Sequence, residues 1–153
     1  MQLALDAYPC DLLFVHRDAE KEGLLARVQQ VEAAAVSAGV EQQLIPVVPV
    51  RMTEAWLLVD EAAIRAAARK PHGIAALGLP HSARIESLPD PKEVLFTALR
   101  AASELTGRRL SKFQPEAQRH RIADHMGSAS AERLRKLPSF AELEARLQAV
   151  FKI

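Results

Sequence analysis

The sequence has a single cysteine, Cys10, among its 153 residues. An internal disulfide is therefore impossible, and a zinc site built from several cysteines is excluded as well. Long apolar runs are also missing, because the longest uncharged apolar stretch covers residues 44–50, whereas a membrane-spanning helix needs about 20 such residues. The first eleven residues contain no basic region, so we expect no secretory signal peptide. These absences favour a cytoplasmic protein that does not enter the membrane.

Two common catalytic signatures are absent too. The six glycines form no glycine-rich phosphate loop, and no serine stands in a Gly-x-Ser-x-Gly sequence. Nucleotide binding through a P-loop and serine hydrolysis through a nucleophile elbow are therefore excluded. Among the basic residues at 108–121 the one aromatic residue is Phe113, so recognition of nucleic acid by base stacking is not indicated.

What the sequence does contain is typical of one globular domain spanning residues 1–153. Hydrophobic residues make up 49% and charged residues 25% of the chain, which is ordinary for a folded domain of this length. The net charge of +1 hides an imbalance. Residues 1–99 hold 9 Lys and Arg against 13 Asp and Glu, and residues 100–153 hold 11 against 6. Such an imbalance suits a metal site beside a polyanion-binding surface, and it also arises by chance in short chains.

Residues 1–60 are predicted to form a βαβ unit. The continuous apolar run at residues 12–15 indicates a strand buried on both faces of a parallel sheet. Residues 19–38 have the apolar spacing of a helix, and Gly39 follows as its stop. Residues 44–50 read as a second strand, whose two prolines predict an edge strand or an irregular one.

Residues 61–153 are predicted to be mostly helical, after a first short helix that Thr53 caps. Asp90 and Pro91 mark the start of another helix. The expected elements, in chain order, are helices at 54–59 and 60–69, a surface loop at 70–88, a helix from 91 to about 105, a basic loop at 108–115, helices at 118–126 and 130–137, and an amphipathic helix from 138.

Two strands make an undersized sheet, because a two-stranded sheet is poorly stable alone. Residues 1–8 either add a short third strand or form the end of a helix. In the second case another chain must complete the sheet. We therefore expect a homodimer or a complex with a partner protein.

Three carboxylates follow the predicted strands. Asp18 and Glu20 come just after the first strand, and Glu54 comes after the second. Ligands of open parallel sheets bind at the carboxyl ends of the strands. Oxygen ligands of this kind suit Mg²⁺ or Mn²⁺, so these three residues are candidate metal ligands and catalytic residues. The alternative is structural: Asp18 caps the following helix, Glu20 complements its dipole, and Glu54 does the same for the next helix.

Other single residues have two interpretations each. His16 lies at strand spacing from Asp18 and is either a site residue or a packed histidine. Trp56 is expected to be a core anchor, and Cys10 a small buried hydrophobic residue. The basic residues are either phosphate binders or a solvated basic surface. They are Arg17, Arg108, Arg109 and Lys112, with a further basic run at residues 119–121.

The sequence around the first acidic pair resembles a known family. Residues 13–23, Leu-Phe-Val-His-Arg-Asp-Ala-Glu-Lys-Glu-Gly, resemble the second motif of the Toprim (topoisomerase–primase) fold. Together with residues 49–60, 88–93 and 134–140 they resemble a prokaryotic domain-of-unknown-function family, number 4276. The resemblance implies a Toprim-like three-layer α/β core with a small, mainly parallel sheet and a helical C-terminal half. It also implies a Mg²⁺-dependent nuclease or phosphotransfer activity and an ATPase as a partner, because some members are encoded near ATPases.

The chain departs from the Toprim pattern at two places. The second Asp of the motif is Glu20, and no Glu-Gly step that would supply the general acid or base precedes Asp11. The leading hypothesis is a Toprim-like nuclease or phosphotransfer domain. The alternative is a catalytically degenerate module that dimerises or binds an ATPase. A plain nucleic-acid binder that uses the basic second part of the chain is a third hypothesis.

Overall fold

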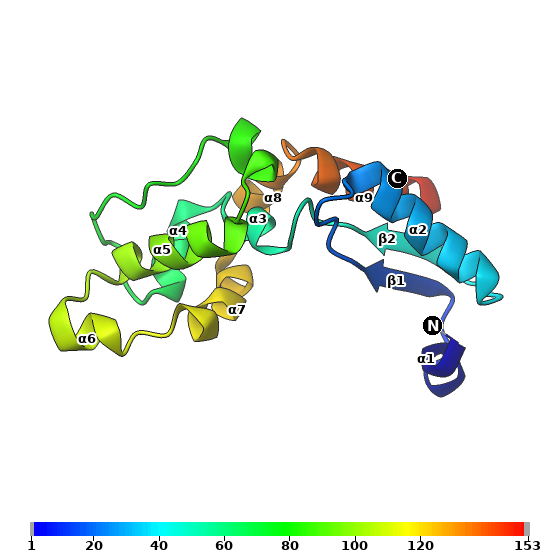
Figure 1. Cartoon of the computed structure of the whole chain (residues 1–153), viewed down its shortest axis with the longest axis horizontal. Coiled ribbons are helices and arrows are strands. Elements are labelled where there is room, and N and C mark those ends of the chain that lie inside the picture. Colours follow the sequence, from blue (N-terminus) through cyan, green and yellow to red (C-terminus); the bar gives the residue numbers. More distant parts are fainter. Residues whose placement is uncertain (1, 152–153) are drawn as a thin grey trace.

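The computed structural model describes residues 2–151, apart from the side chains of Gln2 and Ala4. The chain is a mixed α/β protein in which helices predominate and two short strands form a parallel sheet. Figure 1 shows an elongated, arched molecule with a helical unit at one end and the sheet at the other. No helix in the described part of the chain is both long and apolar enough to cross a membrane.

The predicted βαβ unit is confirmed. Strand β1 (Leu12–His16) pairs in parallel with β2 (Gln43–Val47), and α2 (Leu24–Ser37) connects them. The expectation that the first strand is buried on both faces is wrong, because Phe14 is 51% exposed. Helices pack mainly on β2, so one face of β1 stays open. The proline prediction is confirmed, since β2 contains Pro46 and is an edge strand.

Helix α2 begins later than the sequence predicts. Glu20 and Gly23 have positive φ angles of 52° and 83°, a backbone conformation that ends regular structure and that glycine adopts at little cost. Residues 17–23 therefore form a loop, and Gly23 rather than Asp18 is the N-cap residue of α2. The structural interpretation of Asp18 as a helix cap is wrong.

The N-terminal segment is a helix, α1 (Gln2–Ala7), so the alternative of a third strand is wrong. Met1, the first residue of that predicted segment, lies outside the described residues. Cys10, between α1 and β1, is exposed, which overturns the expectation of a buried cysteine. The strands consequently remain a pair within residues 2–151.

The helical unit holds the larger of two hydrophobic clusters. Helices α3 (Glu54–Leu57), α4 (Glu61–Ala67), α5 (Pro91–Ser103) and α7 (Pro115–His125) pack against one another. Its fully buried side chains include Leu58, Ile64, Ile85, Leu95, Leu99, Ile122 and Leu137. The smaller cluster, Ala19, Val28 and Val48, lies between the sheet and α2.

Three short elements surround this unit. The predicted basic loop is wrong in part, because residues 107–111 form a helical turn, α6 (Gly107–Ser111). The predicted surface loop contains a 3₁₀ helix, η1 (Ser82–Ser87). Helix α8 (Ser128–Leu134) then leads toward the C-terminal helix.

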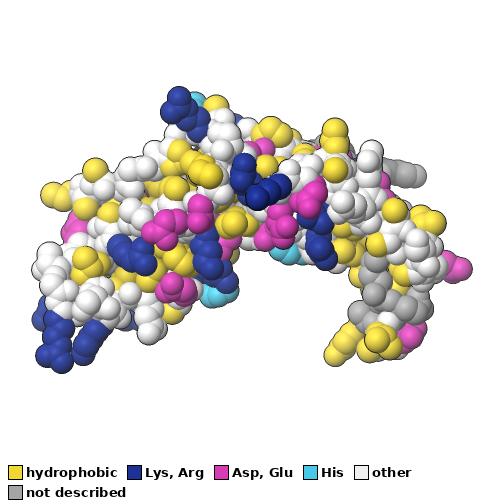
Figure 2. Space-filling model, in the orientation of Figure 1, with side chains coloured by type: hydrophobic (Ala, Val, Ile, Leu, Met, Phe, Trp, Pro, Cys, Tyr) yellow, Lys and Arg dark blue, Asp and Glu magenta, His cyan; other side chains and the backbone are white. Residues whose placement is uncertain are grey.

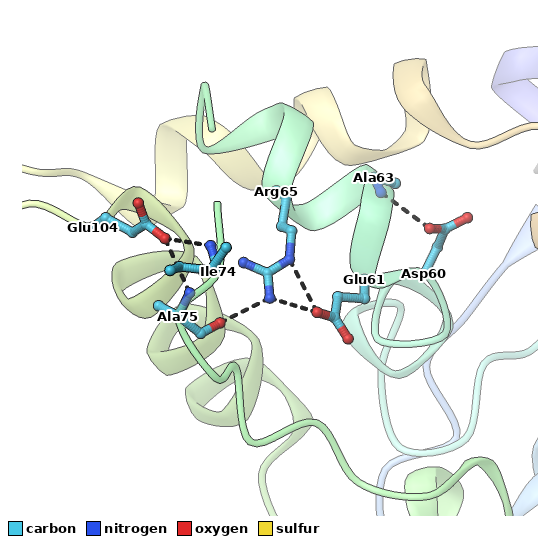
Figure 3. A network of polar contacts seen from close by, with 7 residues as sticks. All are labelled: Asp60, Glu61, Ala63, Arg65, Ile74, Ala75 and Glu104. Atoms are coloured by element: carbon cyan, nitrogen blue, oxygen red, sulfur yellow. Dashed lines mark hydrogen bonds and ion pairs between the residues drawn. The ribbon is translucent and has the colours of Figure 1, made fainter. Parts of the chain in front are cut away.

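A polar network holds the long loop before η1 against the helical unit (Figure 3). Glu104 accepts hydrogen bonds from the backbone N–H groups of Ile74 and Ala75, at 2.6 and 3.0 Å. Arg65 donates to the carbonyl oxygen of Ala75 at 2.8 Å. A Cβ atom at Gly73 would lie 2.9 Å from Glu104 Oε1, so a side chain at this position would require the Glu104 carboxylate to shift.

The final helix, α9 (Pro138–Phe151), returns from the helical unit to the sheet and packs on β2. Arg146 pairs with Glu32 of α2 at 2.7 Å. At the other end of α9, Trp56 stacks edge-to-face on Phe140 and donates to Ser139 Oγ at 2.8 Å. The prediction of Trp56 as an anchor is confirmed, and α9 joins the two parts of the molecule.

Candidate functional site

A cleft of about 530 Å³ lies between the carboxyl ends of the strands and the helical unit. It collects side chains from the loop after β1, from α3, from the start of α5 and from α7. In Figure 2 acidic, basic and histidine side chains gather around the concave middle of the molecule. The polar lining residues are Asp18, Thr53, Glu54, Lys92, Arg119 and His120.

Asp18 is the acidic residue that β1 delivers to the cleft. Burial raises the pKa of its carboxyl group, and the neighbouring carboxylate of Glu54 raises it further, against the lowering influence of His16 and of Thr53. Its Oδ1 lies 3.6 Å from His16 Nε2 and 3.5 Å from Thr53 Oγ1. His16 therefore lies on the same side as Asp18, as its strand spacing predicts.

The Thr53 side chain lines the cleft and does not cap the helix that follows it. Its φ and ψ angles of −55° and −32° are already helical, and its side chain makes no capping hydrogen bond. The prediction of Thr53 as a side-chain N-cap is wrong in this respect. The hydroxyl instead lies 3.0 Å from His16 Nε2, so Thr53 links the histidine to Asp18.

Glu54 is the second carboxylate of the cleft. It stands in the first turn of α3, where a negative charge complements the helix dipole, and its side chain is only 9% exposed. Arg119 of α7 forms a short ion pair with it. The two carboxylates thus differ. Glu54 has a guanidinium partner, whereas the partners of Asp18 within residues 2–151 are His16 and the hydroxyl and backbone N–H groups of Thr53.

Glu20 lies outside the cleft. Its side chain is 68% exposed, and its nearest charged partner is Arg27, at 3.9 Å. Arg27 bonds more closely to Glu22, at 2.9 Å. The structure therefore brings Asp18 and Glu54 together and leaves Glu20 apart. Within residues 2–151, no three acidic, histidine or cysteine side chains converge as a ready-made metal site.

The four predicted phosphate binders also lie outside the cleft. Arg17 lines a separate cavity beside α2. Arg108 and Arg109 belong to α6 and Lys112 follows it, at the end of the molecule opposite the sheet (Figure 1). The cations of the cleft are Lys92 and Arg119.

The sequence predicts two of the three candidate carboxylates correctly as neighbours in one cleft, but none of the four candidate phosphate binders lies there. Lys92 follows Asp90 and Pro91 and was interpretable only as part of a helix start. Arg119 and His120 belong to the predicted basic run, and their shared presence in the cleft arises from the packing of α7 on α3. Nothing in the local sequence of α7 indicates that contact.

The fold and the cleft define a mixed α/β protein with two carboxylates and two cations at the carboxyl edge of a small parallel sheet. Comparison of the chain with protein-family models, curated proteins and solved structures finds no significant match.

Proposed function

We propose that this chain is a Toprim-like domain that uses a divalent metal ion to act on phosphate groups, as a nuclease or a phosphotransferase. One observation carries the proposal. Asp18, from the loop after β1, and Glu54, from the first turn of α3 after β2, line one cleft, whose remaining charged groups are the cations Lys92 and Arg119. Carboxylates beside cations suit a metal ion and a phosphate bound next to each other.

The donor set fits Mg²⁺ or Mn²⁺. Mg²⁺ is commonly held by one or two carboxylates, with water and substrate phosphate in the other positions. Asp18 and Glu54 would hold the ion, and the raised pKa of Asp18 supports this, since burial and a like charge disfavour its ionised form until a cation is present. When bound, the metal supplies an activated water and neutralises charge on the phosphoryl group.

The other residues of the cleft bind and orient. Arg119 offers a planar guanidinium that matches phosphate oxygens, and Lys92 adds a compact positive charge. Arg119 and Glu54 form an ion pair. A metal ion bound by Glu54 and a phosphate bound by Arg119 would therefore lie next to each other. Thr53 and His16 hold the Asp18 carboxylate in place through their contacts with Oδ1.

The direct test is titration of Mn²⁺ into the purified protein, followed calorimetrically. We expect saturable binding that Asp18→Asn weakens at least about tenfold, because one of two ligand charges is removed. Glu20→Gln should leave binding within about twofold, since that side chain is exposed and lies outside the cleft. Asp124→Asn, on the exposed side of α7, is the matched control.

The wild-type protein and all three variants are then assayed with labelled single- and double-stranded oligonucleotides in Mg²⁺ and Mn²⁺. Metal-dependent cleavage that Asp18→Asn abolishes supports the nuclease. Equal Mn²⁺ affinity of the wild-type and Asp18→Asn proteins, or no Mn²⁺ binding with or without an oligonucleotide, would contradict the proposed metal site.

A non-enzymatic interaction module is the second candidate, and the open sheet favours it. The two strands leave Phe14 half exposed, and such a sheet gains stability when another chain pairs with it. An ATPase or a second copy of the chain would be the partner. Self-association without Mn²⁺ binding supports this candidate over the first.

A further inference from the structure

The outer edge of β1 is a row of unused backbone groups. The N–H groups of Arg17 and Ala19 and the carbonyl of Asp11 all bond toward β2. Successive residues of a strand direct these groups to opposite edges, so those of Leu12, Phe14 and His16 point away from β2. No strand within residues 2–151 pairs with this edge (Figure 1).

The side chains along this edge are not those of a protected edge strand. Natural edge strands usually carry lysines, prolines or inward-pointing charges that prevent pairing. The five residues of β1 include no lysine and no proline, and Phe14 at the centre is 51% exposed. The charges stand only at the two ends of the strand, at Asp11 and Arg17.

We propose that a second copy of this chain pairs with the free edge, with the two β1 strands antiparallel about a two-fold axis at Phe14. A two-fold axis makes such an interface self-complementary. This register is the one in which all five residues of both strands face each other. In this register Leu12 of each copy faces His16 of the other, and Phe14 faces Phe14. The outward-pointing backbone groups of each facing pair can then form hydrogen bonds with each other. The product is a four-stranded sheet in the order β2-β1-β1-β2.

Charge complementarity selects a second copy as the occupant. In this register Asp11 lies opposite Arg17 of the second copy, and the pair occurs twice. Both residues are exposed, and neither side chain has an ion pair or hydrogen bond within the described part of the chain. Opposite charges facing each other across strands stabilise their pairing, as does the Phe14 pair at the centre.

Neighbouring registers lack this match. Sliding the second strand by two residues preserves the hydrogen-bonding pattern but sets Asp11 against Val15, or Arg17 against Leu13. Each leaves charges without partners and shortens the paired segment. The five residues of β1 do not line the cleft, although His16 at the end of the strand contacts Asp18.

The test begins with sedimentation velocity across micromolar concentrations, where we expect a monomer–dimer equilibrium. Arg17→Asp should weaken dimerisation about tenfold or more, because two attractive pairs become two repulsive ones. The double variant Asp11→Arg with Arg17→Asp should restore it. Arg84→Asp, which reverses an exposed charge outside the sheet, should have no effect.

A cysteine scan then tests the register, in a Cys10→Ser background. Phe14→Cys should crosslink to its own copy under mild oxidation, since facing residues of a hydrogen-bonded antiparallel pair have Cα atoms about 5.5 Å apart, within disulfide range. Leu13→Cys and Val15→Cys should crosslink far more slowly. A monomer at all concentrations, a dimer indifferent to charge reversal, or faster crosslinking at position 13 or 15 would overturn the proposal. Mn²⁺ titration of the same preparations separates this failure from failure of the metal site.

Discussion

At the scale of single residues, the two carboxylates of the cleft are in different electrostatic positions. Glu54 is nearly buried but has Arg119 as an ion-pair partner. Asp18 is partly buried and faces Glu54, with no arginine or lysine partner among residues 2–151, and burial and the Glu54 charge raise its pKa. Carboxyl groups with a perturbed pKa, as at Asp18, are frequent at functional sites. The free-energy cost of ionising Asp18 in this environment is therefore the feature of a single residue that most specifically indicates a functional site.

This cost predicts that Asp18→Asn stabilises the metal-free protein at neutral pH. The neutral amide avoids the burial and repulsion penalty of the carboxylate. The gain should stay below about 1 kcal/mol, because the side chain is 37% exposed and solvent screens its interactions. Urea unfolding of both proteins in the presence of a chelator measures it.

The pH dependence has a definite sign. The pKa of Asp18 in the folded protein lies above its ordinary value of 3.8, so folding favours the protonated form. Wild-type stability relative to the variant should therefore be highest below pH 3.8 and fall as the pH rises through the folded-state pKa. An Asp18→Asn protein that is clearly less stable than the wild type at pH 7 would mean that the carboxylate has a structural role.

At the scale of elements, two aspartates begin helices in contrasting environments. Asp60 caps α4 through the N–H of Ala63 at 3.0 Å, and Asp90 caps α5 through that of Glu93 at 2.9 Å. Asp60 is buried and also accepts a short hydrogen bond from Ser130 and pairs with Arg133 at 3.0 Å. Burial raises the pKa of Asp60, but these partners outweigh burial and lower it overall.

We predict that Asp60→Ala destabilises the protein by about 3 kcal/mol, because it removes a cap and leaves Ser130 and Arg133 without their acceptor. Asp90→Ala, which removes a comparable cap at the exposed start of α5, should cost about 1 kcal/mol. Urea unfolding of the two variants side by side gives the comparison. Equal losses would show that the link from α4 to α8 contributes nothing beyond the cap.

The same elements show what the sequence can predict. The βαβ order, the start of α5 at Asp90 and the helix from Pro138 follow from local patterns, and the structure confirms them. Patterns failed where distant contacts decide. Threonine is a common N-cap residue, but the Thr53 hydroxyl instead forms a hydrogen bond with the ring of His16, 37 residues away. The apolar run of β1 predicts burial, whereas the helices cover β2 instead.

At the scale of the whole molecule, the cleft belongs to neither hydrophobic cluster alone. Asp18 follows β1 in the unit with the small cluster, whereas Lys92 and Arg119 belong to helices of the larger one. Helix α9 holds the two units together through its contacts with β2 and with Trp56. The geometry of the carboxylates and cations therefore depends on how the units are joined, which no local sequence pattern encodes.

The basic residues of α6 lie far from this junction. Phosphate binding at α6 can therefore be tested separately from phosphate binding in the cleft. Figure 2 shows Lys and Arg side chains at the end of the molecule that α6 occupies in Figure 1. If the substrate is a nucleic acid, this end would contact its backbone beyond the cleft. The combined variant Arg108→Gln, Arg109→Gln and Lys112→Gln should then lower the slope of log affinity against log salt by about 2 for single-stranded DNA.

The same variant should leave Mn²⁺ affinity unchanged, because α6 does not line the cleft. Lys92→Gln is the informative comparison, since it removes one charge from the cleft itself and should reduce the slope by only about 0.7. Fluorescence anisotropy with a labelled oligonucleotide at several salt concentrations measures both slopes. An unchanged slope in the triple variant would confine any phosphate contact to the cleft and favour a small phosphorylated substrate over a long polyanion.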